Sequence, residues 1–236
     1  MNKEVENFNF IKIKRNLIND KDISQIRILL NHIYQNNICQ WRPFKDEYNY
    51  FQYFDNQDEG TKVRKIMHHI VLGNWGKHSI EQKKLINILD PLKKFVCEIN
   101  GETKNLTSPP SKGYCSKFSF NCYPSEKGYL SAHNDQSWDM ERLRVLLILS
   151  KYSKNKNEGF WVMNQKKRVF INELTTIKPG DAIIFNQNNL HGFCNMKLSS
   201  NCSNIDNKNI WLDPGASLDC TFYHALVSQY KNPYDY

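Results

Sequence analysis

Apolar residues recur at helical spacing in two segments near the start of the chain. Those between Ile23 and Ile33 fall on one face of a helix, with Asp20 or Asp22 as the candidate cap. The same spacing runs from Val63 to Val71, so we predict a second helix there. Between the two lies an aromatic-rich stretch, Trp41 to Phe54, which either packs against the second half of the chain or walls a binding pocket.

A third helical pattern follows a recognisable start signal. Ser79 begins an S-x-x-Q capping box with Gln82, and the apolar positions from Leu85 to Val96 continue at helical spacing. Pro91 lies inside this run and should kink it or split it in two, because proline cannot donate a backbone hydrogen bond. We therefore expect residues 1–112 to form a mainly helical support region.

The pattern changes after a polar linker from Gly101 to Gly113. Residues 113–236 contain short runs that alternate in polarity or are wholly apolar, separated by turn residues, which indicates strands of a sandwich or barrel. These runs are KFSFNCY (117–123), LRVLLIL (143–149), GFWVMN (159–164), RVFIN (168–172), DAIIF (181–185) and SLDCTFYHALV (217–227). We predict an α+β fold in one domain, residues 1–236, with the helical half packed on the β core.

Composition and charge limit the classes of protein. The chain has 236 residues, and a hydrophobic content of 40 % excludes a disordered chain. The longest apolar run is Val145–Leu149, so we expect no membrane contact. The start lacks an apolar signal-peptide core, so we expect a cytoplasmic protein whose seven cysteines are reduced. The net charge of +8 suggests that the protein binds nucleic acid. The basic residues are dispersed, however, and match no nucleic-acid-binding motif, so we do not expect that partner.

The residues that carry chemistry lie in the second half. His133 and Asp135 are two apart, so an extended backbone projects them to the same side, and His191 follows 56 positions after Asp135. Two imidazoles and one carboxylate suit Fe(II) held on one face with open positions for other ligands. Zinc is the other candidate, although a hydrolytic zinc site needs an activating base, which the sequence does not identify.

The order and framing of these residues resemble the Fe(II)/2-oxoglutarate-dependent dioxygenases, especially the prolyl-hydroxylase-like and phytanoyl-CoA-dioxygenase-like branches. The first part of the frame is Tyr123, Pro124, Gly128, His133, Asp135, Arg142, Leu149, Ser150, Glu158 and Gly159. The second part is Pro179, Gly180, Asp181, Phe185, His191 and Gly192. The resemblance covers about residues 115 to 227 and implies a double-stranded β-helix (jelly-roll, cupin-like) core.

The resemblance also implies a function. Fe(II) would bind His133, Asp135 and His191, with 2-oxoglutarate as co-substrate and O2 as oxidant, releasing succinate and CO2 as a C–H bond of the substrate is oxidised. Tyr123 resembles the family tyrosine that hydrogen-bonds the co-substrate, though a strand aromatic can also be a core residue. Trp138 lies in the loop that commonly borders the substrate, as a rim contact or a packing anchor.

The chain departs from the family at the basic residue expected beyond the second histidine. No arginine follows Arg168, and residues 215–217 near the expected place are Gly, Ala and Ser. The alternatives for binding the far carboxylate of 2-oxoglutarate are Arg142 or Arg144 on the strand after the H-x-D motif, and Lys197 or Lys208 in the late loop. Loss of this contact would indicate another co-substrate or none.

Three functions remain open from the sequence. The first is a hydroxylase, or a related C–H oxidase, of a small molecule or an amino-acid side chain, and a protein prolyl-type hydroxylase is its near alternative. The second is a non-catalytic β-helix protein that has lost 2-oxoglutarate. The third is a basic nucleic-acid-binding protein, supported by charge alone. No feature of the sequence sets the oligomeric state.

Overall fold

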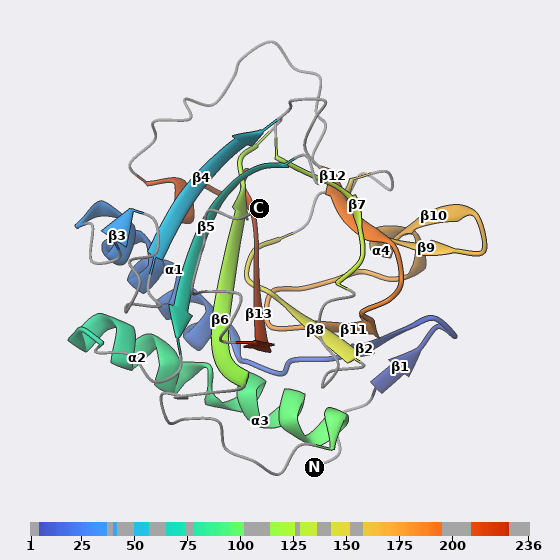
Figure 1. The fold of residues 1–236 in the computed structure, drawn as a ribbon, viewed down its shortest axis with the longest axis horizontal. Coiled ribbons are helices and arrows are strands. Elements are labelled where there is room, and N and C mark those ends of the chain that lie inside the picture. The colour runs from blue at the N-terminus through green and yellow to red at the C-terminus, as the bar shows by residue number, and fades with distance from the viewer. Residues whose placement is uncertain are drawn as a thin grey trace.

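A curled, largely antiparallel sheet forms the centre of the fold in the computed structural model (Figure 1). The structure describes residues 5–36, 40–41, 50–56, 65–73, 78–101, 114–125, 128–135, 143–151, 158–194 and 209–226. The main path of strands is β1-β2-β11-β8-β13-β6-β5-β7-β12-β9-β10, with β4 also paired to β5 and β3 to β4. This is the predicted α+β architecture with a jelly-roll core.

The elements are bounded as follows. The strands are β1 (Val5–Asn7), β2 (Ile11–Lys14), β3 (Gln40–Trp41), β4 (Tyr50–Asn56), β5 (Lys65–Gly73), β6 (Tyr114–Tyr123), β7 (Tyr129–His133), β8 (Leu143–Ile148), β9 (Gly159–Asn164), β10 (Lys167–Phe170), β11 (Ala182–Asn186), β12 (His191–Cys194) and β13 (Ser217–Leu226). The helices are α1 (Asp20–Gln35), α2 (Ile80–Ile88), α3 (Asp90–Asn100), α4 (Ile171–Leu174) and the 3-10 turn η1 (Ile210–Leu212). In the described residues, no helix has the length and apolar character needed to span a membrane.

The helices α1, α2 and α3 cover one face of the sheet (Figure 1). In β6, Phe118, Phe120 and Cys122 are buried in the cluster that these helices form with the sheet, whereas Ser119 and Asn121 line a pocket on the opposite face. The polar–apolar alternation of a strand therefore separates a hydrophobic core from a functional surface. A second cluster, inside the curl, joins β2, β8, β9, β11 and β12.

The helix boundaries largely follow the sequence signals. The capping box at Ser79 is present, and the predicted break at Pro91 separates α2 from α3, with the proline in the first turn of α3. The cap of α1 is Asn19, not Asp20 or Asp22: its side-chain oxygen accepts the backbone N–H of Asp22 at 2.9 Å. The prediction of Asp20 or Asp22 was wrong there, because asparagine caps helices as well as aspartate does.

Replacing Ser79 with alanine should lower the free energy of unfolding by about 1 kcal/mol, since the backbone N–H of Gln82 loses its acceptor. Urea unfolding of the variant measures the change. Ser24→Ala in α1 is the matched control, because its hydroxyl donates only to a backbone carbonyl that is already in a helix. An equal loss in both variants would contradict a role for the cap.

The predicted helix from Val63 to Val71 is wrong, because Lys65–Gly73 forms strand β5. Ile70 and Leu72 pack against the helices, while Met67 belongs to the cluster inside the curl. A strand with apolar residues on both faces gives a nearly continuous apolar run, which periodicity does not separate from a helix. His68 and His69 both lie on this strand, and His69 lines the pocket.

Two glycines of the late motif have structural roles. Gly180 has a φ of +88°, its N–H donates to Ile148 O at 2.8 Å, and a Cβ there would lie 2.1 Å from Ile18 O. Gly192 has no such torsion, but a Cβ would lie 2.6 Å from both Leu130 O and the Trp161 ring. The P-G-D turn and the His-Gly pair therefore fix how β11 and β12 approach their neighbours.

Candidate metal centre

Three side chains converge at the junction of β7 and β12. His133 ends β7 and lies directly opposite His191, the first residue of β12, in the antiparallel ladder. Asp135 follows two residues later, and its backbone N–H donates to Gln187 O at 3.0 Å, in the turn that precedes His191. One ligand atom from each of the three lies within 4.8 Å of the others. The sequence predicted this cluster, and the strand pairing assembles it.

Hydrogen bonds fix the ring nitrogen that each histidine presents. His133 Nδ1 lies 2.9 Å from Ser131 O, and His191 Nδ1 lies 2.9 Å from Asn189 O. A carbonyl oxygen only accepts, so Nδ1 carries the proton and Nε2 keeps its lone pair. The Nε2 atoms lie 3.9 Å and 3.6 Å from the two carboxylate oxygens of Asp135. Such carbonyl contacts to the outer nitrogen are typical of metal-binding histidines.

The protonation states suit a cation. Burial, together with nearby His133, lowers the pKa of His191 to about 4, so its ring is neutral at pH 7. Burial alone would raise the pKa of Asp135, but the charge of Arg144 and the adjacent imidazoles hold it below its ordinary value. The neutral ring of His191, the ionised carboxylate of Asp135 and the ring of His133 match the residue types of an Fe(II) site held on one face. The residues present therefore fit the metal that the resemblance implies.

Arg144 is part of the wall beside this cluster. It comes from β8, is only 5 % exposed, and donates from Nε to Asp135 Oδ2 at 3.1 Å. The sequence named Arg142 or Arg144 among the candidates for the far carboxylate of a co-substrate, and in the structure the Nε of Arg144 contacts the carboxylate of Asp135. The contact orients Asp135 and compensates its negative charge in a buried setting.

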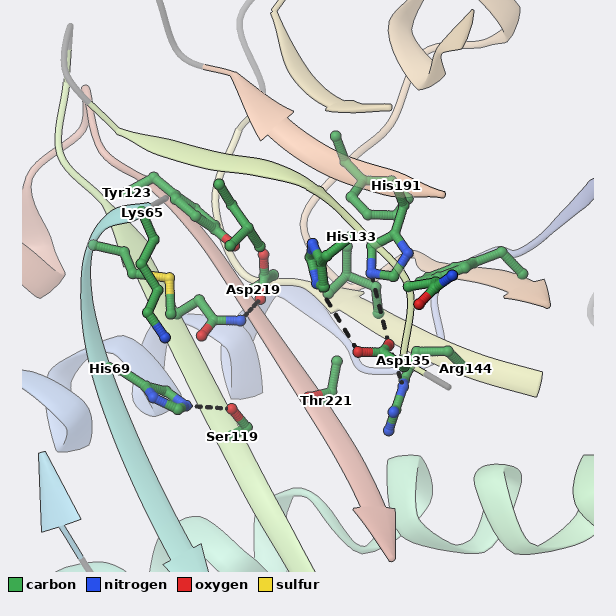
Figure 2. A pocket seen from close by; sticks show the side chains of 17 residues that line it. Lys65, His69, Ser119, Tyr123, His133, Asp135, Arg144, His191, Asp219 and Thr221 are labelled. Carbon is green, nitrogen blue, oxygen red and sulfur yellow. Dashed lines mark hydrogen bonds and ion pairs between the residues drawn. The ribbon is translucent and has the colours of Figure 1, made fainter. Parts of the chain in front are cut away.

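The cluster opens into a pocket of about 450 Å³ inside the curl of the sheet (Figure 2). Phe185 and Phe160 pack beside His191, with ring centroids 4.8 Å and 5.8 Å from its own. The volume lies in the range of about 300 to 1,000 Å³ that is usual for small-molecule sites. The pocket is lined by Lys65, Met67, His69, Ser119, Asn121, Tyr123, Leu130, His133, Asn134, Asp135, Arg144, Leu146, Phe160, Phe185, His191, Asp219 and Thr221.

Tyr123 lines the pocket at the end of β6. It is 2 % exposed, and its ring stacks on Phe193 with centroids 3.9 Å apart. This packing fixes the ring, so the core and pocket interpretations of Tyr123 are compatible. The other predicted site residues, Trp138, Arg142, Lys197 and Lys208, lie outside the described residues.

The sequence did not predict the polar floor of the pocket, which consists of Lys65, His69, Asp219 and Thr221. Lys65 and His69 come from β5, where the apolar spacing predicts a helix, and Asp219 and Thr221 come from β13. The signal was present in β6 and β13, where polar residues alternate with apolar ones through S-F-N and D-C-T. Polar side chains at every second position of strands whose other face is core indicate a lined cavity.

Comparisons with known proteins agree with this architecture. No protein-family model matches the chain, and no curated protein matches it. A prolyl hydroxylase from Trichoplax adhaerens, solved with a hypoxia-inducible-factor peptide, superposes with a TM-score of 0.54 and 14 % identity over 97 % of this chain and 88 % of its own. The chain has the fold of the Fe(II)/2-oxoglutarate-dependent dioxygenases.

Other solved structures with the dioxygenase fold match at similar levels. A prolyl-4-hydroxylase from Pseudomonas putida has a TM-score of 0.50 and 8 % identity over 92 % of both chains. The non-heme α-ketoglutarate-dependent epimerase SnoN of nogalamycin biosynthesis has a TM-score of 0.51 and 7 % identity over 91 % of this chain and 77 % of its own. These likenesses establish the fold, and the cluster of His133, Asp135 and His191 supplies the chemical argument.

Proposed function

We propose that this protein is an Fe(II)- and 2-oxoglutarate-dependent oxygenase that oxidises a C–H bond of a small molecule or an amino-acid side chain. The observation that carries the proposal is the convergence of His133, Asp135 and His191, with both histidines fixed by carbonyl groups on their outer nitrogens. Fe(II), 2-oxoglutarate and O2 would supply the oxidation, with release of succinate and CO2.

The chain's own residues would bind, orient and exclude water. His133, His191 and Asp135 would hold the metal, and Arg144 favours the ionised carboxylate of Asp135 and orients it. The rings of Phe160 and Phe185 cover His191, which limits water at that side of the cluster. An intact carboxylate at Asp135 supports hydroxylation or a related oxidation, since related halogenases carry a small residue there.

The size of the pocket supports a small substrate. About 450 Å³ accommodates a co-substrate with a compact molecule or a single side chain. A prolyl-type protein hydroxylase is the nearest alternative, favoured by the spacing from Tyr123 to His133. Mass spectrometry of candidate peptides after incubation would favour that alternative if one of them gained a single oxygen atom.

An anaerobic titration tests the proposal. Metal-free protein receives Fe(II) and then 2-oxoglutarate while the visible charge-transfer band of the chelate is followed. We expect the band to appear at one equivalent of iron, and succinate to form when air is admitted. Iron binding without the band would contradict the co-substrate and favour a non-catalytic β-helix protein, and failure to bind iron would contradict the metal centre.

A further inference from the structure

The pocket has a second cationic region remote from the metal cluster. Among the described residues that line the pocket, one is a lysine, Lys65, and one is an arginine, Arg144. Arg144 is engaged beside the cluster through Asp135. Lys65 and His69 lie on the opposite side of the pocket, with Asp219 and Thr221 between them and the cluster (Figure 2).

Strand β5 places Lys65 there. Residues 65, 67 and 69 all line the pocket, as expected for alternate positions of one strand. Lys65 lies opposite Leu130 of β7, the strand that ends at His133. His69 lies opposite Asn121 of β6, which lies opposite Asp219 of β13. The backbone ladders therefore fix the end of the pocket that holds Lys65 relative to the metal ligands.

The surroundings of Lys65 favour an anion. His69 Nε2 lies 2.6 Å from Ser119 Oγ, so the pair offers a hydrogen bond rather than a second charge. Burial, followed by the positive charges of Lys65 and Lys117, holds the pKa of His69 well below its usual value, so its ring is neutral. Burial removes water from the ammonium group of Lys65 and thereby lowers its pKa. An anion bound beside this ammonium group would offset that loss of solvation.

We propose that Lys65, beside the hydrogen-bonded pair His69–Ser119, binds the carboxylate of 2-oxoglutarate that is remote from the metal cluster. This inference rests on the proposed function, since it assigns one end of the co-substrate. It also agrees with the absence of a basic residue at 215–217, near the place where the family pattern expects one, and with strand β13, which presents Asp219 and Thr221 to the pocket.

The carboxyl group of Asp219 does not oppose this assignment. Asn121 Nδ2 donates to Asp219 Oδ1 at 2.8 Å, and burial raises the pKa of Asp219 to about 7. At neutral pH the group is therefore protonated in a large fraction of molecules. A ligand carboxylate nearby would favour the protonated form further, and a protonated carboxyl can donate a hydrogen bond to it.

The test compares two 2-oxo acids that differ only in the remote carboxylate. Anaerobic Fe(II)-loaded protein is titrated with 2-oxoglutarate and with 2-oxopentanoate, which ends in a methyl group, and the charge-transfer band gives each Kd. In Lys65→Met we expect the Kd for 2-oxoglutarate to rise by about 10- to 100-fold, because a charge-assisted contact is lost. The Kd for 2-oxopentanoate should not change. Lys65→Arg should retain the preference for the diacid.

Lys167→Met is the matched control, since Lys167 is an exposed lysine of β10 that lies outside this pocket. It should leave both Kd values unchanged. Unaltered binding of 2-oxoglutarate in Lys65→Met, or an equal loss for both acids, would overturn the assignment while leaving the proposed function standing. Absence of the band in the unsubstituted protein would instead overturn the proposed function and this inference together. Circular dichroism confirms that each variant is folded.

Discussion

Replacing His191 with alanine should weaken Fe(II) binding by more than about 100-fold, because even loss of an outer hydrogen bond to a metal ligand costs about 10- to 100-fold. The ring is buried and neutral, and its Nε2 faces Asp135 Oδ2 at 3.6 Å. Removing it leaves one imidazole and one carboxylate, which is too few ligands for a tight Fe(II) site. Anaerobic equilibrium dialysis of the metal measures the effect.

The control for this variant is His32→Ala, at the exposed end of α1. It should bind iron as the unsubstituted protein does. His191→Gln serves as a second test variant, since it fills more of the buried space and separates loss of the ligand from a packing defect. Iron affinity retained in both His191 variants would show that the metal binds elsewhere.

Replacing Asp219 with asparagine should stabilise the protein at high pH. Burial raises the pKa of this carboxyl from 3.8 to about 7 in the folded state. Between these values the folded protein holds a proton that the unfolded chain has released, so the free energy of unfolding falls as the pH rises. Above the folded-state value, the full cost of burying the charge is present. Asparagine does not ionise and can still accept the hydrogen bond from Asn121.

The difference between the two pKa values corresponds to about 4 kcal/mol at most. We therefore expect the free energy of unfolding of Asp219→Asn to exceed that of the unsubstituted protein by about 2 to 4 kcal/mol at pH 8. Near pH 4 the two free energies of unfolding should be nearly equal. Urea unfolding across this pH range measures it. Asp20→Asn, at an exposed position of α1, should show no such divergence. A constant difference at all pH values would show that the carboxyl is not the cause.

The cluster of His133, Asp135 and His191 could be predicted from the sequence because its signal is local. His133 and Asp135 lie at the end of one strand, and the turn residues before His191 predict that a new strand begins there. Strands β6, β8, β9 and β13 were also predicted, because each alternates in polarity or is a short apolar run. These features depend on neighbouring residues, so one sequence suffices to read them.

The floor of the pocket could not be predicted, because its position depends on distant strand pairing. Lys65 sits at the start of a run that fits a helix as well as a doubly buried strand. Only the pairing of β5 with β6 and β7 shows that this lysine faces the pocket. Similarly, nothing in the sequence indicates that Arg144 meets Asp135, since that contact depends on the curl of the sheet.

The position of β13 also bears on how the chain folds during synthesis. β13 lies between β6 and β8, and both of its ladders with them are made by residues far apart in the chain. Until residues 217–226 have left the ribosome, β6 and β8 both present open edges, which are prone to pair with other chains. The side of the pocket facing the metal ligands is then incomplete. A nascent chain that already contains His133 and His191 therefore still lacks the strand that completes the pocket. At that stage a chaperone that covers the open strand edges would protect it most against aggregation.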